Sequence, residues 1–258
     1  MNDYLFHTLP LWVIYIGIVL IILLSVRGGM AFARWRRKHI TGEDDAPINT
    51  IVGATLGLLA FILAFTFGLT SSRFEARKQF LLEEVNSIET SWLRAGLVSQ
   101  PFNDQLRKEL VDYVELRIWL LDNPDKVQEV IKKSEGIQSN IWSLLEDLTQ
   151  RNIGDTRINA WLIDSVNNMF DYQSRRISKG LIDRIPNLIW IALFVLVIIA
   201  MFEVGYLFGK SEKSNWVLVL ALSMAFSAVI IIIVDLDSSK GNITINNQVL
   251  YDMYQRIK

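Results

Sequence analysis

The stretch Ile48–Phe80, INTIVGATLGLLAFILAFTFGLTSSRFEARKQF, begins as apolar sequence of membrane length and continues without proline into a charged helical pattern. Residues 48–69 include no charged side chain. Roughly 20 residues that rise about 1.5 Å each are enough to cross a hydrocarbon core of about 30 Å. The stretch therefore predicts one long helix that leaves the bilayer and continues beyond it.

Small residues recur along one face of this predicted helix, and phenylalanines lie beside them. At about 100° per residue, Phe61 and Phe65 lie along one edge of the small-residue face. Two interpretations fit this pattern. Small residues let helix backbones approach closely in lipid, which favours packing; the same residues with the phenylalanines also suit the lining of a pore or gate. The small-residue face consists of Gly53, Gly57, Ala60, Ala64, Gly68 and Ser71.

Composition places the chain among integral membrane proteins. Of its 258 residues, 51% are hydrophobic and they are concentrated in blocks. The formal net charge of −1 argues against a nucleic-acid-binding surface. The chain has no cysteine, which excludes disulfides, thiolate metal sites and cysteine nucleophiles. Its two histidines, His7 and His39, stand far from any acidic cluster, so we expect no metal site, no cofactor and no catalytic residue.

Three further apolar blocks complete the predicted membrane part. Leu9–Val26 is longer than the core of a signal peptide and is interpreted as a retained anchor. The last two blocks are joined by a short loop, which predicts an antiparallel hairpin. The four predicted spans cover residues 9–26, 48–71, 186–208 and 216–234, approximately.

Between the second and third spans the sequence is typical of a helical domain. It is rich in Glu, Arg, Lys, Leu and Ile, and it has no strand-like alternation. A first helix continues from the second span to about Gly96, and Asp155 is a predicted N-cap for the last helix, which we expect to reach Arg184. The prediction is an all-α fold of four transmembrane helices with a helical extramembrane domain between the second and third. Its parts are a transmembrane hairpin (1–71), the helical domain (72–185), a second hairpin (186–234) and a polar C-terminal tail on the domain side (235–258).

Charged residues near the spans give a topology argument and one candidate site. The short loop after the first span is basic, and the positive-inside rule then favours an external domain. Glu203 is the one ionisable residue within the third apolar block. An intramembrane carboxylate suggests an ion site or a proton acceptor. Its position near the membrane end, beside Tyr206, equally fits a structural or snorkelling role.

Three segments carry a resemblance to the bacterial bestrophin-like family, and through it a remote resemblance to bestrophin ion channels. Phe61–Phe65, followed by Arg73, is similar to the bestrophin pore helix. EEVNSIETSWLRA, at Glu83–Ala95, resembles the segment after that helix. Asp235–Asp237 and then Gly241–Ile245 resemble the family's acidic motif after the last span.

The resemblance implies a homo-oligomeric, pentameric ion channel in the plasma membrane of a bacterium. Its second span would line a narrow hydrophobic neck at Gly57, Phe61 and Phe65. A phenylalanine ring of this kind gates by dewetting, and the positive edges of the rings favour an anion. The resemblance also implies a cytoplasmic domain, which is the opposite of what the charge count favours.

The calcium clasp of animal bestrophins is not matched by this sequence. Only Asp235 and Asp237 remain of its acidic run, and a calcium ion needs six to eight oxygen ligands. We therefore expect no bound metal.

The leading hypothesis is an oligomeric channel for small anions, with the lipid bilayer, inorganic ions and further copies of the chain as partners. The alternative is a non-conducting membrane sensory or interaction protein whose helical domain binds a partner. An enzyme is disfavoured, because the sequence shows no clustered histidines, no glycine-rich phosphate loop and no Ser/His/Asp arrangement.

Overall fold

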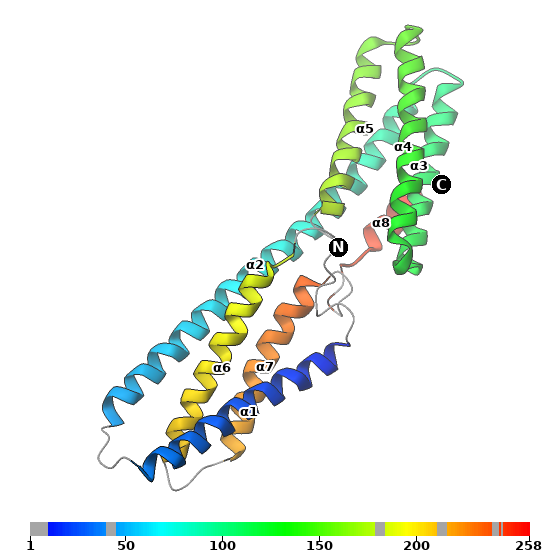
Figure 1. Ribbon diagram of the computed structural model, residues 1–258. Helices are drawn as coiled ribbons and strands as arrows, with labels where there is room; N and C mark the ends of the chain where they lie inside the picture. Colours follow the sequence, from blue (N-terminus) through cyan, green and yellow to red (C-terminus); the bar gives the residue numbers. More distant parts are fainter. Residues whose placement is uncertain (1–9, 40–44, 179–183, 211–215, 239–242, 244) are drawn as a thin grey trace. The chain divides into compact units, whose positions relative to one another are not determined.

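The computed structural model describes residues 10–39, 45–178, 184–210, 216–238, 243 and 245–258. Within these residues every regular element is helical and no strand occurs, which confirms the all-α prediction. Figure 1 shows the order of the helices. They are α1 (Leu11–Arg37), α2 (Asp45–Ala95), α3 (Phe102–Asp122), the short 3₁₀ helix η1 (Pro124–Lys126), α4 (Val127–Gln150), α5 (Thr156–Ile177), α6 (Asn187–Lys210), α7 (Trp216–Asp237) and α8 (Gln248–Ile257).

Four of these helices, α1, α2, α6 and α7, are long and apolar enough to cross a membrane. They correspond to the four predicted spans. Helix α2 has 51 residues, so the second span does continue into the helical domain without a break, as the absence of proline predicted.

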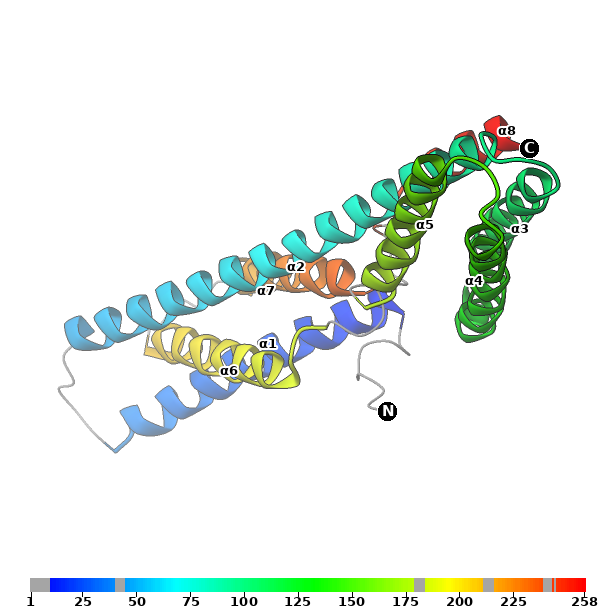
Figure 2. The ribbon, with the colours of Figure 1, turned by 90° about the horizontal axis from the view of Figure 1, so that it is seen from above.

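The chain divides into two compact units. The first comprises residues 1–74 and 183–244, and the second comprises residues 75–182 and 245–258. In the first unit α6 and α7 pack against α1 (Figures 1 and 2). Fully buried aliphatic side chains from different spans, such as Ile22, Leu193 and Ile230, form its apolar core.

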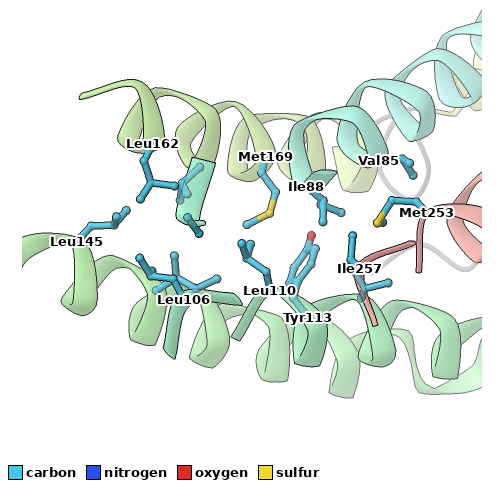
Figure 3. Close-up of a cluster of buried hydrophobic side chains, with 14 of the residues drawn as sticks. Val85, Ile88, Leu106, Leu110, Tyr113, Leu145, Leu162, Met169, Met253 and Ile257 are labelled. Carbon is cyan, nitrogen blue, oxygen red and sulfur yellow. The ribbon is translucent and has the colours of Figure 1, made fainter. Parts of the chain in front are cut away.

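The second unit is a helical bundle with its own apolar core. Figure 3 shows Ile88 of α2 and Met169 of α5 on one side of this core, and Leu110 and Tyr113 of α3 on the other. Leu145 of α4 belongs to the same cluster. These residues are the inward faces of amphipathic helices, whose apolar positions recur every three or four residues.

The last predicted helix of the domain is confirmed at its start and is wrong at its end. Asp155 caps α5, because its Oδ1 accepts a hydrogen bond of 2.7 Å from the backbone N–H of Arg157. Gly154 precedes the cap with φ of +79°, a conformation that favours glycine. Helix α5 ends at Ile177 and Arg184 is not helical; residues 179–183 lie outside the described residues.

The segment expected to be a polar tail contains a helix. Leu250, Met253 and Ile257 lie on one face of α8 and are buried in the core of the second unit. The spacing of three and four residues marks an amphipathic helix. The C-terminal residues are therefore part of the bundle.

Candidate pore-lining face and membrane-exit cluster

Helix α2 packs into the membrane unit with one face only. Leu59 and Leu63 on this face join the core formed with α1, α6 and α7. Thr66 and Thr70 are also fully buried there, and each hydroxyl donates to a backbone carbonyl of the preceding turn, Ile62 and Phe67 respectively. The buried face thus has its polar groups satisfied within the helix itself.

The opposite face of α2 holds the three predicted pore-lining residues. Gly57, Phe61 and Phe65 are all exposed, and the two phenylalanines have 64% and 54% of their surface uncovered. Burying a phenylalanine side chain is worth about 1.5–3 kcal/mol in a soluble protein, but in lipid the apolar surroundings remove this driving force. The part of the chain that the structure describes therefore leaves this face uncovered.

The glycines of α2 do not pack against other helices of the same chain. At Gly53, Gly57 and Gly68 an added Cβ would meet no atom within 4 Å. For these three glycines the described residues of the chain supply no packing partner, so the packing interpretation stays a prediction about contacts with further copies of the chain. No helix that the structure describes covers this face.

Close glycine packing occurs instead between α1 and α6. A Cβ at Gly205 would collide with the backbone of Val26, and one at Gly209 would lie 2.8 Å from the Met30 carbonyl oxygen. On α1, a Cβ at Gly29 would collide with the carbonyl oxygen of Phe202. Gly205 and Gly209 are four residues apart, the spacing that brings helix backbones together in membranes. This signal was present in the sequence and was missed.

The post-membrane acidic residues form a polar cluster where three spans end or begin. Asp237 is the last residue of α7, and its Oδ1 lies 3.5 Å from Nη1 of Arg73 on α2. The same oxygen accepts a hydrogen bond of 3.3 Å from the backbone N–H of Ile185, just before α6. Arg184 donates to the backbone carbonyl of Asp237. One aspartate therefore ties α2 and the start of α6 to the end of α7.

Asp235 has a separate structural contact. It is buried, and its Oδ2 accepts a hydrogen bond of 3.0 Å from the backbone N–H of Ile243. Acidic residues at a helix C-terminus are unfavourable next to the negative end of the helix dipole. The guanidinium groups of Arg73 and Arg184 offset this cost at the end of α7.

Glu203 lies apart from the pore-lining face. It is half-buried on α6, next to Phe202, whose ring centroid lies 5.8 Å from that of Phe32 on α1. The ring of Tyr206 also packs on Phe32. Oε2 of Glu203 is buried and accepts no hydrogen bond from the described part of the chain. The aromatic contacts beside Glu203 on α6 are therefore made with Phe32 of α1.

Sequence reasoning missed a buried polar network in the second unit. Glu84 of α2 lies 2.7 Å from Nε of Arg176 and 3.5 Å from Nε of Arg117, and both contacts are ion pairs. The hydroxyl of Tyr113 donates to Glu84 at 2.7 Å, and the amide of Gln173 lies 2.6 Å from that hydroxyl. Burial raises the pKa of the Glu84 carboxyl, and Arg117 and Tyr113 act in the opposite direction. These groups join α2, α3 and α5 through one carboxylate.

Comparison with known families decides where the chain belongs. The family described as Bestrophin-like domain matches residues 19–240, which include most of α1, the other three spans in full and the helical domain up to but not including α8. The chain belongs to the bestrophin-like family. This confirms the resemblance that was inferred from the three sequence segments.

Solved structures agree on the fold of this bestrophin-like chain. Two crystal structures of point variants of a bacterial bestrophin homolog from Klebsiella pneumoniae match with TM-scores of 0.68 and 0.67 at 12% identity. The alignments cover 96% and 95% of this chain and 97% and 96% of those chains. A crystal structure described as a membrane protein matches with a TM-score of 0.69, also at 12% identity, over 96% of this chain and 97% of that one. A comparison with curated proteins finds no match.

Family and structure together make the bestrophin-like chain a multi-pass membrane protein of an ion-channel family. Its acidic motif does not fit an oxygen-ligated calcium ion. The Asp237 carboxylate faces the Arg73 guanidinium, and Asp235 accepts from a backbone N–H. No group of three or more His, Asp or Glu residues suited to a metal occurs among the residues that the structure describes.

Proposed function

We propose that the bestrophin-like chain is one subunit of a homo-oligomeric, pentameric channel in a bacterial plasma membrane. Helix α2 of each subunit lines the ion path. Gly57, Phe61 and Phe65 form a hydrophobic neck, and the conducted ions are small anions. The other spans hold α2 in place and separate it from lipid.

The observation that carries this proposal is the uncovered face of α2. A transmembrane helix whose neighbours all pack on one side has its other side free to border an axial path. The exposed residues on that side are small or aromatic: Gly57 and Gly68 leave room, and Phe61 and Phe65 narrow it. In a bestrophin-like chain, a helix face on which glycines leave room and phenylalanines narrow it supports a hydrophobic neck.

The chemistry of the neck supports gating by water and a preference for anions. A ring of phenylalanine side chains is too apolar to keep a water column unless it widens. The edges of aromatic rings carry partial positive charge, which interacts favourably with an anion that passes between them. Neither property requires a charged residue at the constriction.

Glu203 is a second proposed ion contact, separate from the neck. Its buried, unbonded Oε2 is suited to accept a proton or a cation. The variant Glu203→Gln keeps the shape and removes the charge. We expect it to change the pH dependence of conduction, and an unchanged pH profile would leave Glu203 with a structural role.

The test is chloride flux from liposomes that contain the purified protein. Phe61→Ala and Phe65→Ala should raise the flux, because a shorter side chain widens the neck and lowers its dewetting barrier. Leu20→Ala is the matched control, since Leu20 is an exposed apolar residue of α1. Flux that is present and equal in all four proteins would contradict the neck. An oligomer that conducts no ion would favour the non-conducting interaction protein instead.

A further inference from the structure

A small polar pocket lies between α2 and α5 in the second unit, and its volume is about 130 Å³. A water molecule occupies about 30 Å³ in the liquid, so the pocket has room for a small ion with part of its hydration shell. The residues that line the pocket are all polar. They are Asn86, Ser87, Thr90 and Arg94 of α2, and Asp164, Ser165 and Asn168 of α5.

Several polar groups of this pocket are left without a partner in the described part of the chain. Hydroxyl groups within helices commonly bond to a carbonyl of the preceding turn. Ser165, which is buried, does so, because its hydroxyl donates at 2.9 Å to the carbonyl three residues before it. The hydroxyls of Ser87 and Thr90 make no such bond among the described residues, and neither do the side-chain amides of Asn86 and Asn168. These four side chains are therefore free to donate hydrogen bonds into the pocket.

The charged groups of the pocket favour a negative ligand. Nη1 of Arg94 lies 3.8 Å from Oδ2 of Asp164, and it also donates to the backbone carbonyl of Trp161. The Asp164 side chain is 71% exposed and that of Arg94 only 32%, so solvent screens the carboxylate more than the guanidinium. A guanidinium group carries five N–H donors, which leaves several of them for a ligand.

We propose that this pocket binds a small monovalent anion such as chloride. The Ser87 and Thr90 hydroxyls and the two asparagine amides donate hydrogen bonds to the anion, and Arg94 supplies the opposite charge. Hydroxyl and amide oxygens can also bind a cation, but the guanidinium repels one. The site belongs to the helical domain and shares no residue with the proposed neck, so it does not depend on conduction.

The first test is thermal unfolding of the purified full-length protein, with chloride replacing gluconate at constant ionic strength. The unfolding midpoint should rise with chloride, because a ligand that binds the folded state stabilises it. Ser87→Ala combined with Thr90→Val removes two donors and should raise the half-saturating chloride concentration roughly tenfold or more. In gluconate alone this double variant should unfold at the wild-type midpoint, since neither hydroxyl bonds to the described chain.

Two further variants control this measurement. Ser143→Ala combined with Thr149→Val is the matched control, because both hydroxyls lie on α4 and bond to their own helix, and its chloride dependence should equal that of the wild type. Asp164→Asn removes the opposing carboxylate and should lower the half-saturating concentration by up to about fivefold. An effect in this direction identifies an anion, since loss of a carboxylate would weaken a cation site.

Bromide locates the site directly. Crystals of the wild type soaked in sodium bromide should show an anomalous peak in the pocket, and crystals of the Ser87→Ala, Thr90→Val double variant should not. The proposal is overturned if the pocket shows no bromide peak, or if the chloride-dependent rise is missing from the wild type or is identical in the wild type, the double variant and Asp164→Asn. Absence of ion flux through liposomes would bear on the proposed channel and leave this site unaffected.

Discussion

Nη1 of Arg73 on α2 lies 3.5 Å from Oδ1 of Asp237, the last residue of α7. This ion pair links the helix that carries the proposed neck to the end of the last span. The Asp237 side chain is largely buried and that of Arg73 is about a quarter exposed. The same carboxylate also holds the backbone N–H of Ile185. The Asp237 side chain therefore connects α2 and the start of α6 to the end of α7 in the membrane unit.

Replacing Asp237 by asparagine should destabilise the protein in detergent. The change leaves the Arg73 guanidinium without its partner, and the expected loss is about 1–3 kcal/mol. Thermal unfolding of the purified protein measures it. Glu75→Gln serves as the control for the ion pair, because Glu75 pairs with Lys78 on the exposed surface, and exposed pairs contribute about 0–1 kcal/mol. Equal stability of Asp237→Asn and the wild type would contradict a stabilising role for the Asp237 contacts.

Substitution of Gly205 by alanine should disturb the packing of α6 on α1. The added Cβ collides with the Val26 backbone, and overpacking of this kind costs about 1–3 kcal/mol. Gly17→Ala is the matched control, because a Cβ at Gly17 on α1 meets no atom within 4 Å. The midpoint of thermal unfolding should fall for the first variant and not for the second. Equal midpoints for the two variants would contradict the close packing of α6 on α1 at Gly205.

How far the sequence predicts this molecule depends on the range of the interactions involved. The spans follow from unbroken apolar runs, and the Asp155 cap follows from a local side-chain preference, so both were found. Which face of α2 is buried could be assigned only once the positions of α1, α6 and α7 were known. Gly57 lies in open space and Gly205 in close contact, although both are glycines in similar apolar sequence. Periodicity alone does not tell which side of a helix its neighbours occupy.

The polar network around Glu84 could not be predicted from the sequence for the same reason, because it depends on which helices pack together. Its partners come from α3 and α5, at Arg117 and Arg176, and nothing in the local pattern pairs them with Glu84. Helix α8 differs, because its apolar spacing at Leu250, Met253 and Ile257 was readable. The surrounding polar residues of the C-terminal segment obscured that spacing.

The docking of α8 should weaken in acid. Hydrogen bonds of 2.8 and 2.9 Å join Glu89 of α2 to the Arg256 guanidinium of α8, and these bonds lower the pKa of Glu89 below its ordinary value. A lowered folded-state pKa gives stability that is complete above the unfolded-state pKa and is lost as the pH falls through the folded-state pKa. Hydrogen exchange of residues 248–258 should therefore accelerate at acidic pH.

The variant Glu89→Gln separates this contact from general acid unfolding. It should show fast exchange in α8 already at neutral pH, with little further change on acidification. Glu129→Gln is the control, because the ion pair of Glu129 is with Lys133 of the same helix, α4. Protection of α8 that is identical in Glu89→Gln and the wild type would contradict this role of the ion pair.

Glu75 should oppose anion entry at the membrane exit of the neck. It follows Gly57 by 18 residues, which is five full turns of α2, so it lies on the same side of the helix. Its side chain is exposed. A ring of such carboxylates repels anions, so Glu75→Gln should raise chloride permeability relative to sodium, seen as a shift in reversal potential under a salt gradient. Glu129→Gln, far along the chain in α4, should leave the reversal potential unchanged.

The central claim is that the exposed face of α2 lines the ion path, and the cysteine-free chain allows it to be tested at one residue. Phe61→Cys is reconstituted in a planar bilayer and treated with a charged methanethiosulfonate reagent, with Leu20→Cys on α1 as the matched control. We predict that the reagent blocks the current through Phe61→Cys and leaves Leu20→Cys and the wild type unaffected. A current through Phe61→Cys that stays unchanged, although mass spectrometry shows the cysteine to be modified, would contradict the claim.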